Sequence, residues 1–265
     1  MVKTYNILKF HIGNGSHLIH LFTINDLIFS KESKYVCVAN VHMFIEAYKD
    51  KRFLAVINDA DLVISDGKPL CLALRWLYGI EQERVAGMDL LPALIEEAEK
   101  NHLKIGFYGY TPEGLHVVSQ KCHELYPDLV EPLCISPPFR ALTQEEEENY
   151  IKTIHDAGVQ MLFVALGCPK QEKWMASMKG RLNTTMIGIG GALPVFAGLQ
   201  SRAPKWMQDV SLEWLYRLIQ EPRRLFKRYF ITNTLFIYLI IREKIKLSFN
   251  KSYKLKVFTE MGLPI

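Results

Sequence analysis

The sequence predicts an α/β protein with a Rossmann-like, mainly parallel sheet that is covered by helices on both faces. Short runs that are apolar throughout alternate with helical patterns along most of the 265 residues. Strands buried on both faces have such continuous apolar character, and their alternation with helices indicates parallel crossover connections. Several of these runs end in loops rich in glycine and polar residues, where doubly wound sheets bind their ligands.

Composition fits a globular protein of a reducing compartment. The chain is 49% hydrophobic and 23% charged, which are globular values, and its length suits one large α/β domain with or without an appendage. Its five cysteines are scattered without a Cys-x-x-Cys pair, which argues against a disulfide framework and against structural zinc. The first ten residues contain no long apolar stretch, so we expect a cytoplasmic protein.

The first 30 residues predict a small β element. Ile7–Ile12 and Leu18–Phe22 are apolar-rich runs on either side of Gly13-Asn14-Gly15. An Asn-Gly pair between two such runs is a strong hairpin signal, so we expect a turn at these three residues.

The central part of the chain predicts the sheet and its covering helices. We expect strands at Tyr35–Ala39, Ala60–Ser65, Lys104–Tyr108, Leu129–Ser136, Gln160–Leu166 and Thr185–Ile189. We expect helices at Met43–Lys51, from Pro69 through Trp76, and at Met88–His102 and Pro112–Tyr126. A further helix opens at the capping box Thr143-Gln144-Glu145-Glu146 and runs to about Ala157.

The C-terminal quarter differs in charge and in pattern. Residues 202–256 carry 13 Lys or Arg and 4 Asp or Glu, whereas the rest of the chain carries 19 and 24. Residues 205–248 read as helical with a break at Pro222, and the apolar core Tyr229–Ile241 is shorter than the ~20 residues that span a bilayer. Basic flanks around an apolar run favour a helix in the lipid interface, and the alternative is a hydrophobic helix docked on the core or on a partner subunit. We therefore divide the chain into a Rossmann-like domain, 1–200, and a basic helical appendage, 201–265.

Four strand-end loops carry the candidate ligand-binding groups. Asn40 follows the first predicted strand, Asp66 the second, Gly167 to Glu172 the fifth, and Gly190-Gly191 the sixth. Loop glycines let the backbone approach a ligand closely, and the following helix N-terminus offers free N–H groups to phosphate. A carboxylate placed like Asp66 suits a general base, but it suits an ordinary helix N-cap equally well.

Five motifs occur in a fixed order and together resemble one family. They are Asp66-Gly67-x-Pro69, Arg84-Val85-x-Gly87-x-Asp89, Gly167-x-Pro169-x-Gln171-Glu172-x-Trp174, Arg202-Ala203-Pro204-x-Trp206, and the long motif from Glu213-Trp214 to Arg223-Arg224. In combination, from about Val36 to Tyr229, the chain resembles the WecG/TagA/CpsF family of bacterial glycosyltransferases. The resemblance covers most of the chain.

The resemblance implies an inverting transfer of an N-acetylmannosamine-like sugar from a UDP-sugar donor to a polyprenyl-diphosphate-linked acceptor, in cell-surface polysaccharide synthesis. It makes Asp66 the catalytic base and requires neither a cofactor nor a bound metal. The substrate contacts that we assign are Asn40, Arg84, Gly87, Gly167, Pro169, Gln171, Gly190, Arg217, Arg223 and Arg224. The family has a threonine two residues before its asparagine, where this chain has Val38, which puts the exact donor sugar in doubt.

Charge considerations agree with transfer without a metal. The Asp-x-Asp spacing of metal-dependent sugar transferases occurs at Asp59-Ala60-Asp61, but this pair precedes a strand and is expected to cap it. Arginines must then hold the departing diphosphate, and the guanidinium group suits it bidentately. We expect the appendage that supplies them to lie on an anionic membrane surface at the inner face of the cell membrane.

Two other classes of protein remain to be weighed. A basic appendage would also permit a nucleic-acid-binding module or a nucleotide-binding module without transferase activity, but the aliphatic run and the lack of a nucleic-acid motif argue against nucleic acid as a partner. A nucleotide-dependent oxidoreductase lacks its Gly-x-Gly-x-x-Gly fingerprint here. The sequence leaves open whether copies of the chain form a homo-oligomer.

Overall fold

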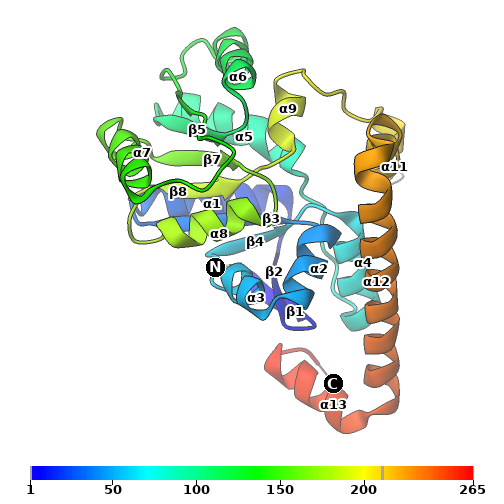
Figure 1. Cartoon of the computed structure of the whole chain (residues 1–265). Coiled ribbons are helices and arrows are strands. Elements are labelled where there is room, and N and C mark those ends of the chain that lie inside the picture. The colour runs from blue at the N-terminus through cyan, green and yellow to red at the C-terminus, as the bar shows by residue number, and fades with distance from the viewer. Residues whose placement is uncertain (1, 210–211, 265) are drawn as a thin grey trace.

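Among residues 2–209 and 212–264, which the computed structural model describes, six strands form one parallel sheet in the order β4-β3-β8-β7-β5-β6. The strands are β3 (Lys34–Ala39), β4 (Leu62–Ser65), β5 (Ile105–Gly109), β6 (Leu133–Ile135), β7 (Met161–Ala165) and β8 (Thr185–Gly188). All neighbouring pairs run parallel. The predicted fold class is therefore confirmed (Figure 1).

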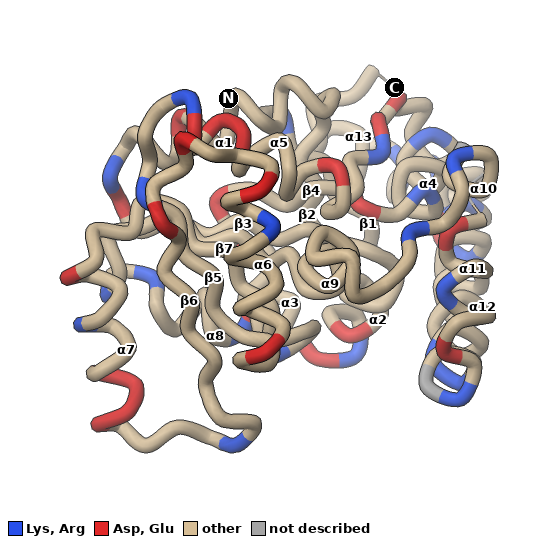
Figure 2. Tube along the Cα trace, turned by 90° about the horizontal axis from the view of Figure 1, so that it is seen from above, with Lys and Arg blue, Asp and Glu red and all other residues tan. Residues whose placement is uncertain are grey.

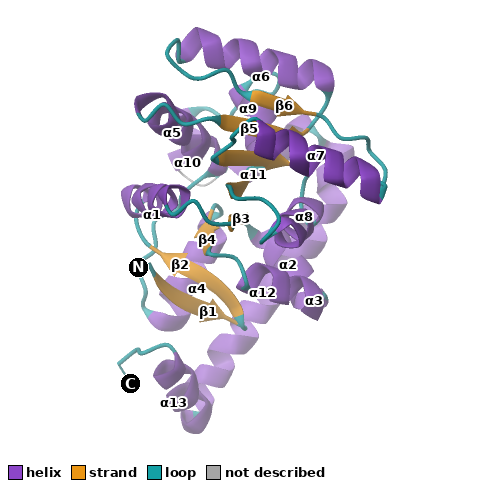
Figure 3. Ribbon diagram, turned by 90° about the vertical axis from the view of Figure 1, so that its left-hand side faces the viewer, coloured by secondary structure: helices purple, strands orange, loops and turns teal. Residues whose placement is uncertain are grey.

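Helices cover both faces of this sheet, as Figure 3 shows. One face packs on α1 (His17–Phe29), α5 (Gly87–Lys100), α6 (Pro112–Leu125) and α9 (Ala192–Phe196). The other face packs on α2 (Val41–Lys49), α3 (Lys51–Asn58), α4 (Lys68–Tyr78), α7 (Gln144–Asp156) and α8 (Lys170–Met178). Along β3, Val36 and Val38 enter the first core, and Tyr35, Cys37 and Ala39 enter the second. Both faces need apolar side chains, which explains why the strands are apolar throughout.

Helix α7 begins where the capping box predicts. The Thr143 hydroxyl accepts the Glu146 N–H at 3.2 Å, and the Glu146 carboxylate accepts the Thr143 N–H at 2.9 Å. Two N-terminal N–H groups that would otherwise lack partners are thus paired, which fixes the start of the helix.

The N-terminal β element is present, but its predicted turn is wrong. Strands β1 (Lys3–Ile7) and β2 (Phe10–Asn14) pair antiparallel, and the chain turns at Leu8 and Lys9, both at positive φ. The segment predicted as the second strand belongs to α1, because Ser16 caps that helix by accepting the Ile19 N–H. Two adjacent positive φ angles make the tight two-residue turn that joins antiparallel strands, here without asparagine or glycine.

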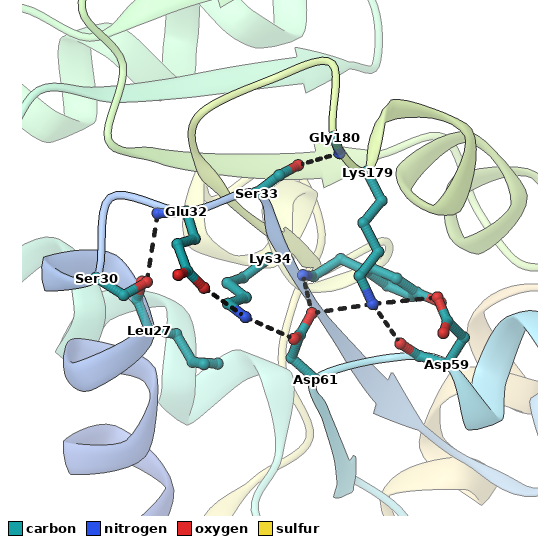
Figure 4. A network of polar contacts seen from close by, with 10 residues as sticks. Leu27, Ser30, Glu32, Ser33, Lys34, Asp59, Asp61, Lys179 and Gly180 are labelled. Carbon is teal, nitrogen blue, oxygen red and sulfur yellow. Dashed lines mark hydrogen bonds and ion pairs between the residues drawn. The ribbon is translucent and has the colours of Figure 1, made fainter.

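Asp59 and Asp61 lie at the amino end of the sheet, and Figure 4 shows the polar network that holds them. The Asp61 carboxylate accepts the Tyr35 N–H at 3.0 Å and lies 3.3 Å from the Lys34 ammonium group. Lys179 bridges the two carboxylates at 3.1 and 3.6 Å. The pair therefore secures the starts of β3 and β4, in agreement with the capping interpretation. It lies at the edge of the sheet opposite to the carboxyl ends of the strands.

The described part of the C-terminal quarter contains four helices: α10 (Lys205–Asp209), α11 (Glu213–Gln220), α12 (Pro222–Phe249) and α13 (Lys251–Glu260). Pro222 occupies the first turn of α12, where its missing N–H costs nothing, so the predicted break falls between α11 and α12. Helix α13 was not predicted. Over the described residues, no helix combines the length and the apolar character needed to cross a bilayer.

Helix α12 packs along one side on the body of the protein, which is formed by residues 1–200. Along its other side it exposes apolar side chains. Phe236 contacts Phe44 of α2 edge to face, with ring centroids 5.2 Å apart, and Leu239 and Ile240 join the same core. Lys244 donates to the Trp76 carbonyl oxygen of α4 at 2.6 Å. Phe226 and Phe230, in contrast, are 63% and 66% exposed. The docked helix that the sequence allowed is thus confirmed for one side of α12, which runs beside α2 and α4 in Figure 1.

Candidate active site

The four loops selected from the sequence follow β3, β4, β7 and β8, which are neighbours in the sheet. Asn40, Asp66, Gly167 and Gly190 therefore lie along one continuous edge, formed by the carboxyl ends of adjacent parallel strands. This edge is where open α/β sheets bind their ligands.

A cavity of about 1220 Å³ lies at this edge and is also lined by residues of α4, α11 and α12. It is lined by eight of the predicted site residues: Asn40, Asp66, Arg84, Gly87, Gly167, Gln171, Gly190 and Arg217. Pro169 and Arg223 do not line it, and Arg223 is exposed. The side chain of Arg224 falls outside what the structure describes. The predicted residues thus converge largely on one cavity.

Asp66 lies half-buried in this cavity, directly after β4. Its Oδ1 accepts the N–H of Gly87, the first residue of α5, at 3.1 Å. The N-cap of α4 is Gly67, so Asp66 is not the ordinary cap of the helix that follows it. Burial raises the pKa of Asp66, while the Gly87 N–H and the positive charge of Arg84 oppose this rise. Such a carboxylate has the accessibility and the basicity of a proton acceptor.

Asn40 has a structural role that can be seen directly. It is the N-cap of α2, and its Oδ1 accepts the Met43 N–H at 3.2 Å. Val38, two residues earlier, also lines the cavity, where its side chain lies near Gly87. An aliphatic group therefore stands where the family resemblance would place a hydroxyl. A ligand contact by Asn40 stays a prediction.

Gln171 ties the loop after β7 to the loop after β8. Its Oε1 accepts the Gly167 N–H at 3.2 Å, and its Nε2 donates to Glu172 Oε1 at 2.7 Å. A Cβ at Gly188 or Gly190 would come within 2.9 or 3.2 Å of the Gln171 amide. Gly188, the last residue of β8, and Gly190, in the loop after it, therefore allow Gln171 to pack closely against the backbone of the cavity wall.

Glu172 gives the first testable prediction, on stability. Its side chain is fully buried, and burial raises its pKa to about 7 from an ordinary 4.5. The folded state therefore holds this proton more tightly than the unfolded state, and stability falls as pH rises from about 4.5 through about 7, by up to about 3 kcal/mol.

Since glutamine cannot ionise, Glu172→Gln should escape this loss. We expect the difference in melting temperature, variant minus wild type, to be larger at pH 8 than at pH 5. Glu145→Gln, on the exposed side of α7, is the matched control. Parallel melting curves of Glu172→Gln and wild type at both pH values would contradict the prediction.

Arginines from the body and from the appendage meet at the cavity. Arg84 Nη2 lies 2.9 Å from Glu213 Oε2 of α11, and Arg217 Nη2 donates to the Gly191 carbonyl oxygen at 3.4 Å. A Cβ on Gly191 would come within 2.5 Å of Arg217 Nη2, so the guanidinium packs directly against this glycine. Positive charge is thereby held at the N-terminal end of α9, which follows the Gly190-Gly191 turn.

The sequence analysis missed the contribution of α12. Residues Leu225, Arg228, Tyr229, Thr232, Asn233, Phe236, Ile237, Ile240 and Ile241 line the cavity. Their spacing of three and four residues is that of one helix face, and this periodicity could have identified them. Arg228 of α12 lines the cavity, whereas the exposed Arg223 does not. Glu213 and Trp214 were quoted as motif residues but were given no role, and both line it.

The described residues contain no cluster of titratable side chains suited to bind a metal ion. In the described ranges, no three His, Cys, Asp or Glu side chains gather closely enough to hold a metal ion. His42 lines the cavity, but burial and the nearby charge of Arg228 lower its pKa. Transfer without a metal stays a prediction.

A parallel α/β sheet whose strand ends open into a large cavity, with a carboxylate and several arginines in its wall, is typical of an α/β enzyme, and the arginines suit an anionic ligand. Residues 5–250 match the model of the glycosyl transferase WecG/TagA/CpsF family, and the chain belongs to this family. The protein is therefore a glycosyltransferase, as the sequence predicted.

Relatives of known name point to one reaction. The chain is 27% identical over 219 residues to the N-acetylglucosaminyldiphosphoundecaprenol N-acetyl-beta-D-mannosaminyltransferase of Staphylococcus aureus strain MW2, covering 82% of this chain and 84% of the relative. It is equally similar to the protein of the same name from Staphylococcus aureus strain NCTC 8325 / PS 47.

Proposed function

We propose that this protein transfers N-acetylmannosamine or a related sugar from a UDP-sugar to a polyprenyl-diphosphate-linked acceptor, with inversion at the anomeric carbon and without a metal ion. The observation that carries the proposal is the Asp66 carboxylate, which lines the cavity together with Arg84 and Arg217. The names of the relatives support the acceptor class and the sugar.

In this reaction Asp66 takes the proton from the acceptor hydroxyl. The hydroxyl oxygen then bonds to the anomeric carbon of the donor, and the bond from that carbon to the β-phosphate oxygen breaks. UDP leaves with the electron pair, so negative charge grows on its β-phosphate. Oδ1 of Asp66 is held by the Gly87 N–H, which orients the carboxylate and leaves Oδ2 for the proton.

Arginine side chains are suited to stabilise the departing diphosphate. Arg84, Arg217 and Arg228 all line the cavity, and they come from the body, α11 and α12. A guanidinium group pairs with phosphate oxygens through two parallel N–H donors and keeps its charge at any working pH. We therefore assign residues 1–200 to donor binding, with residues 201–265 completing the site.

The apolar part of the same cavity suits the lipid chain of the acceptor. Leu72 and Trp76 of α4 and Ile237 and Ile241 of α12 line it, and all four are partly exposed. Apolar walls at one end and charged groups at the other match a substrate with a prenyl tail and a diphosphate-linked sugar. The prenyl chain would then lie against these side chains of α4 and α12.

The exposed side chains on the outer side of α12 support contact of the protein with a membrane. Phe226 and Phe230 are exposed and stacked, with ring centroids 6.3 Å apart. Arg223 and Lys227 are exposed close by on the same helix, and Figure 2 shows Lys and Arg gathered along α11 and α12. Exposed aromatic and basic side chains on one helix bind an anionic lipid surface. We place the protein peripherally at the inner face of the cell membrane.

The double substitution Phe226→Ser, Phe230→Ser is expected to weaken binding to anionic phospholipid vesicles by about tenfold or more, because two buried aromatic contacts with lipid are lost. Sedimentation with the vesicles measures this. Phe139→Ser is the matched control, since Phe139 is 85% exposed on the loop before α7. Equal loss of vesicle binding in the double variant and in Phe139→Ser would contradict the proposed membrane contact of α12.

A transfer assay tests the proposed function directly. Purified protein, a panel of UDP-sugars and a short-chain prenyl-diphosphate N-acetylglucosamine should give a disaccharide product in the presence of a metal chelator. Calorimetric titration with UDP, NAD and a short oligonucleotide separates the other classes. Binding of the oligonucleotide alone, without UDP binding or product, would exclude the transferase reaction proposed here.

A further inference from the structure

A chain of ion pairs joins the appendage to the cavity wall. Arg202 Nη1 lies 2.6 Å from Asp89 Oδ1 at the start of α5, and Arg202 Nε lies 3.7 Å from Glu213 Oε1. The other oxygen of Glu213, Oε2, lies 2.9 Å from Arg84 Nη2. The order is therefore Asp89, Arg202, Glu213, Arg84, with Glu213 between two guanidinium groups.

The inner pair of this chain is the more buried one. The Arg84 and Glu213 side chains are 17% and 14% exposed, whereas Arg202 and Asp89 are 25% and 49% exposed. Arg84 and Glu213 line the cavity, and Arg202 and Asp89 do not. Partial burial strengthens a charged hydrogen bond, so the inner pair should hold its geometry in solution.

We propose that Glu213 is a positioning residue for the transfer reaction: its carboxylate fixes the Arg84 guanidinium at the cavity wall and offsets the charge of Arg84 beside Asp66. This inference rests on the proposed function, because it assumes that Asp66 accepts the proton. Arg84 uses one nitrogen for Glu213 and keeps its remaining N–H donors for the diphosphate.

The charges around Asp66 show why an offset is needed. Arg84, before α5, and Arg217 of α11 stabilise the ionised form of Asp66, and Glu213 of α11 opposes them. Arg202 interacts with Asp66 from the loop before α10, and the buried thiol of Cys71 faces it from α4. Uncompensated arginines would make the Asp66 carboxylate a weaker base, since a lower pKa lowers its affinity for the acceptor proton.

Glu213→Gln separates charge from geometry. The glutamine amide oxygen still accepts from Arg84, but the negative charge is gone. Because a group that raised the pKa of Asp66 is removed, the acid limb of the kcat/KM profile is expected to move to lower pH. Thermal melting of the variant should match the wild type. A purely structural Glu213 would leave the position of this limb unchanged.

Glu213→Ala removes charge and acceptor together, and kcat/KM is expected to fall about tenfold or more as Arg84 loses its fixed orientation. Glu96→Gln is the matched control, because Glu96 pairs with Lys100 on the exposed surface of α5 and neither residue lines the cavity. Its rate and pH profile should equal those of the wild type.

Two outcomes would overturn the inference. One is an unmoved acid limb in Glu213→Gln with a raised KM, which would make Glu213 a direct substrate contact. The other is wild-type kcat/KM in Glu213→Ala. Failure of the proposed function gives a different result. In that case Asp66→Asn would keep the transfer rate of the wild type, regardless of the kinetics of the Glu213 variants.

Discussion

Asp66→Asn is expected to lower kcat by about 10²–10⁴-fold, the range that a general base contributes, while UDP binding stays close to that of the wild type. Asparagine has the same shape, and its Oδ1 can still accept the Gly87 N–H that holds the carboxylate at 3.1 Å. The substitution thus removes the proton acceptor and leaves the cavity wall in place.

Single-turnover transfer and calorimetric UDP titration, run on the same preparation, measure the two quantities. The informative pattern is a loss of rate without loss of affinity. An unchanged rate would remove Asp66 from the chemistry, and a parallel loss of UDP affinity would make it a binding residue instead of a base.

Arg217→Ala is expected to have the second-largest effect, a loss of UDP affinity of about 10- to 100-fold. Charge-assisted hydrogen bonds of an arginine to phosphate contribute about 1.5–3 kcal/mol. Arg217 lines the cavity and lies against the Gly190-Gly191 turn, with its Nη2 3.4 Å from the Gly191 carbonyl oxygen. The guanidinium is therefore held where the diphosphate would meet the N-terminal end of α9.

Arg223→Ala is the matched control for this experiment. Arg223 belongs to the same motif, but it is exposed and does not line the cavity, so UDP affinity should stay near that of the wild type. Equal losses in the two variants would mean that general charge of the appendage, and not placement of Arg217, accounts for nucleotide binding.

Both results bear on how the appendage takes part in catalysis. Helices α11 and α12 supply Glu213, Arg217 and Arg228 to a cavity whose floor comes from the sheet. Under the proposed function, a segment that carries both the proposed diphosphate contacts and the exposed aromatic side chains of α12 would couple completion of the site to its position on the membrane.

The pattern of apolar residues within short segments was sufficient to predict the strands of the sheet. Tyr35–Ala39 and Gln160–Leu166 were recognisable because strands covered on both faces are apolar at every position, and such runs differ clearly from the polar loops around them. The capping box at Thr143 fixed the start of α7 for a similarly local reason, since its two hydrogen bonds lie within four residues.

The N-terminal hairpin shows where local pattern fails. Gly13-Asn14-Gly15 has the composition of a tight turn, but the turn lies at Leu8 and Lys9, and Ser16 starts a helix. Gly13 is required for another reason: a Cβ there would come within 2.9 Å of Leu62 of β4. Contact between β2 and the main sheet, which is distant in sequence, decided the register.

The sequence by itself determined which residues stand at the strand ends, Asp66 among them, and through its ordered motifs it determined the family. Only the tertiary structure decided that β4, β3, β8 and β7 are adjacent, which brings Asn40, Asp66, Gly167 and Gly190 to one cavity. It also decided that Arg228, rather than Arg223, faces that cavity from α12. The periodicity within α12 shows which residues share a helix face, but strand order and the choice of the face that meets the cavity depend on packing between distant segments.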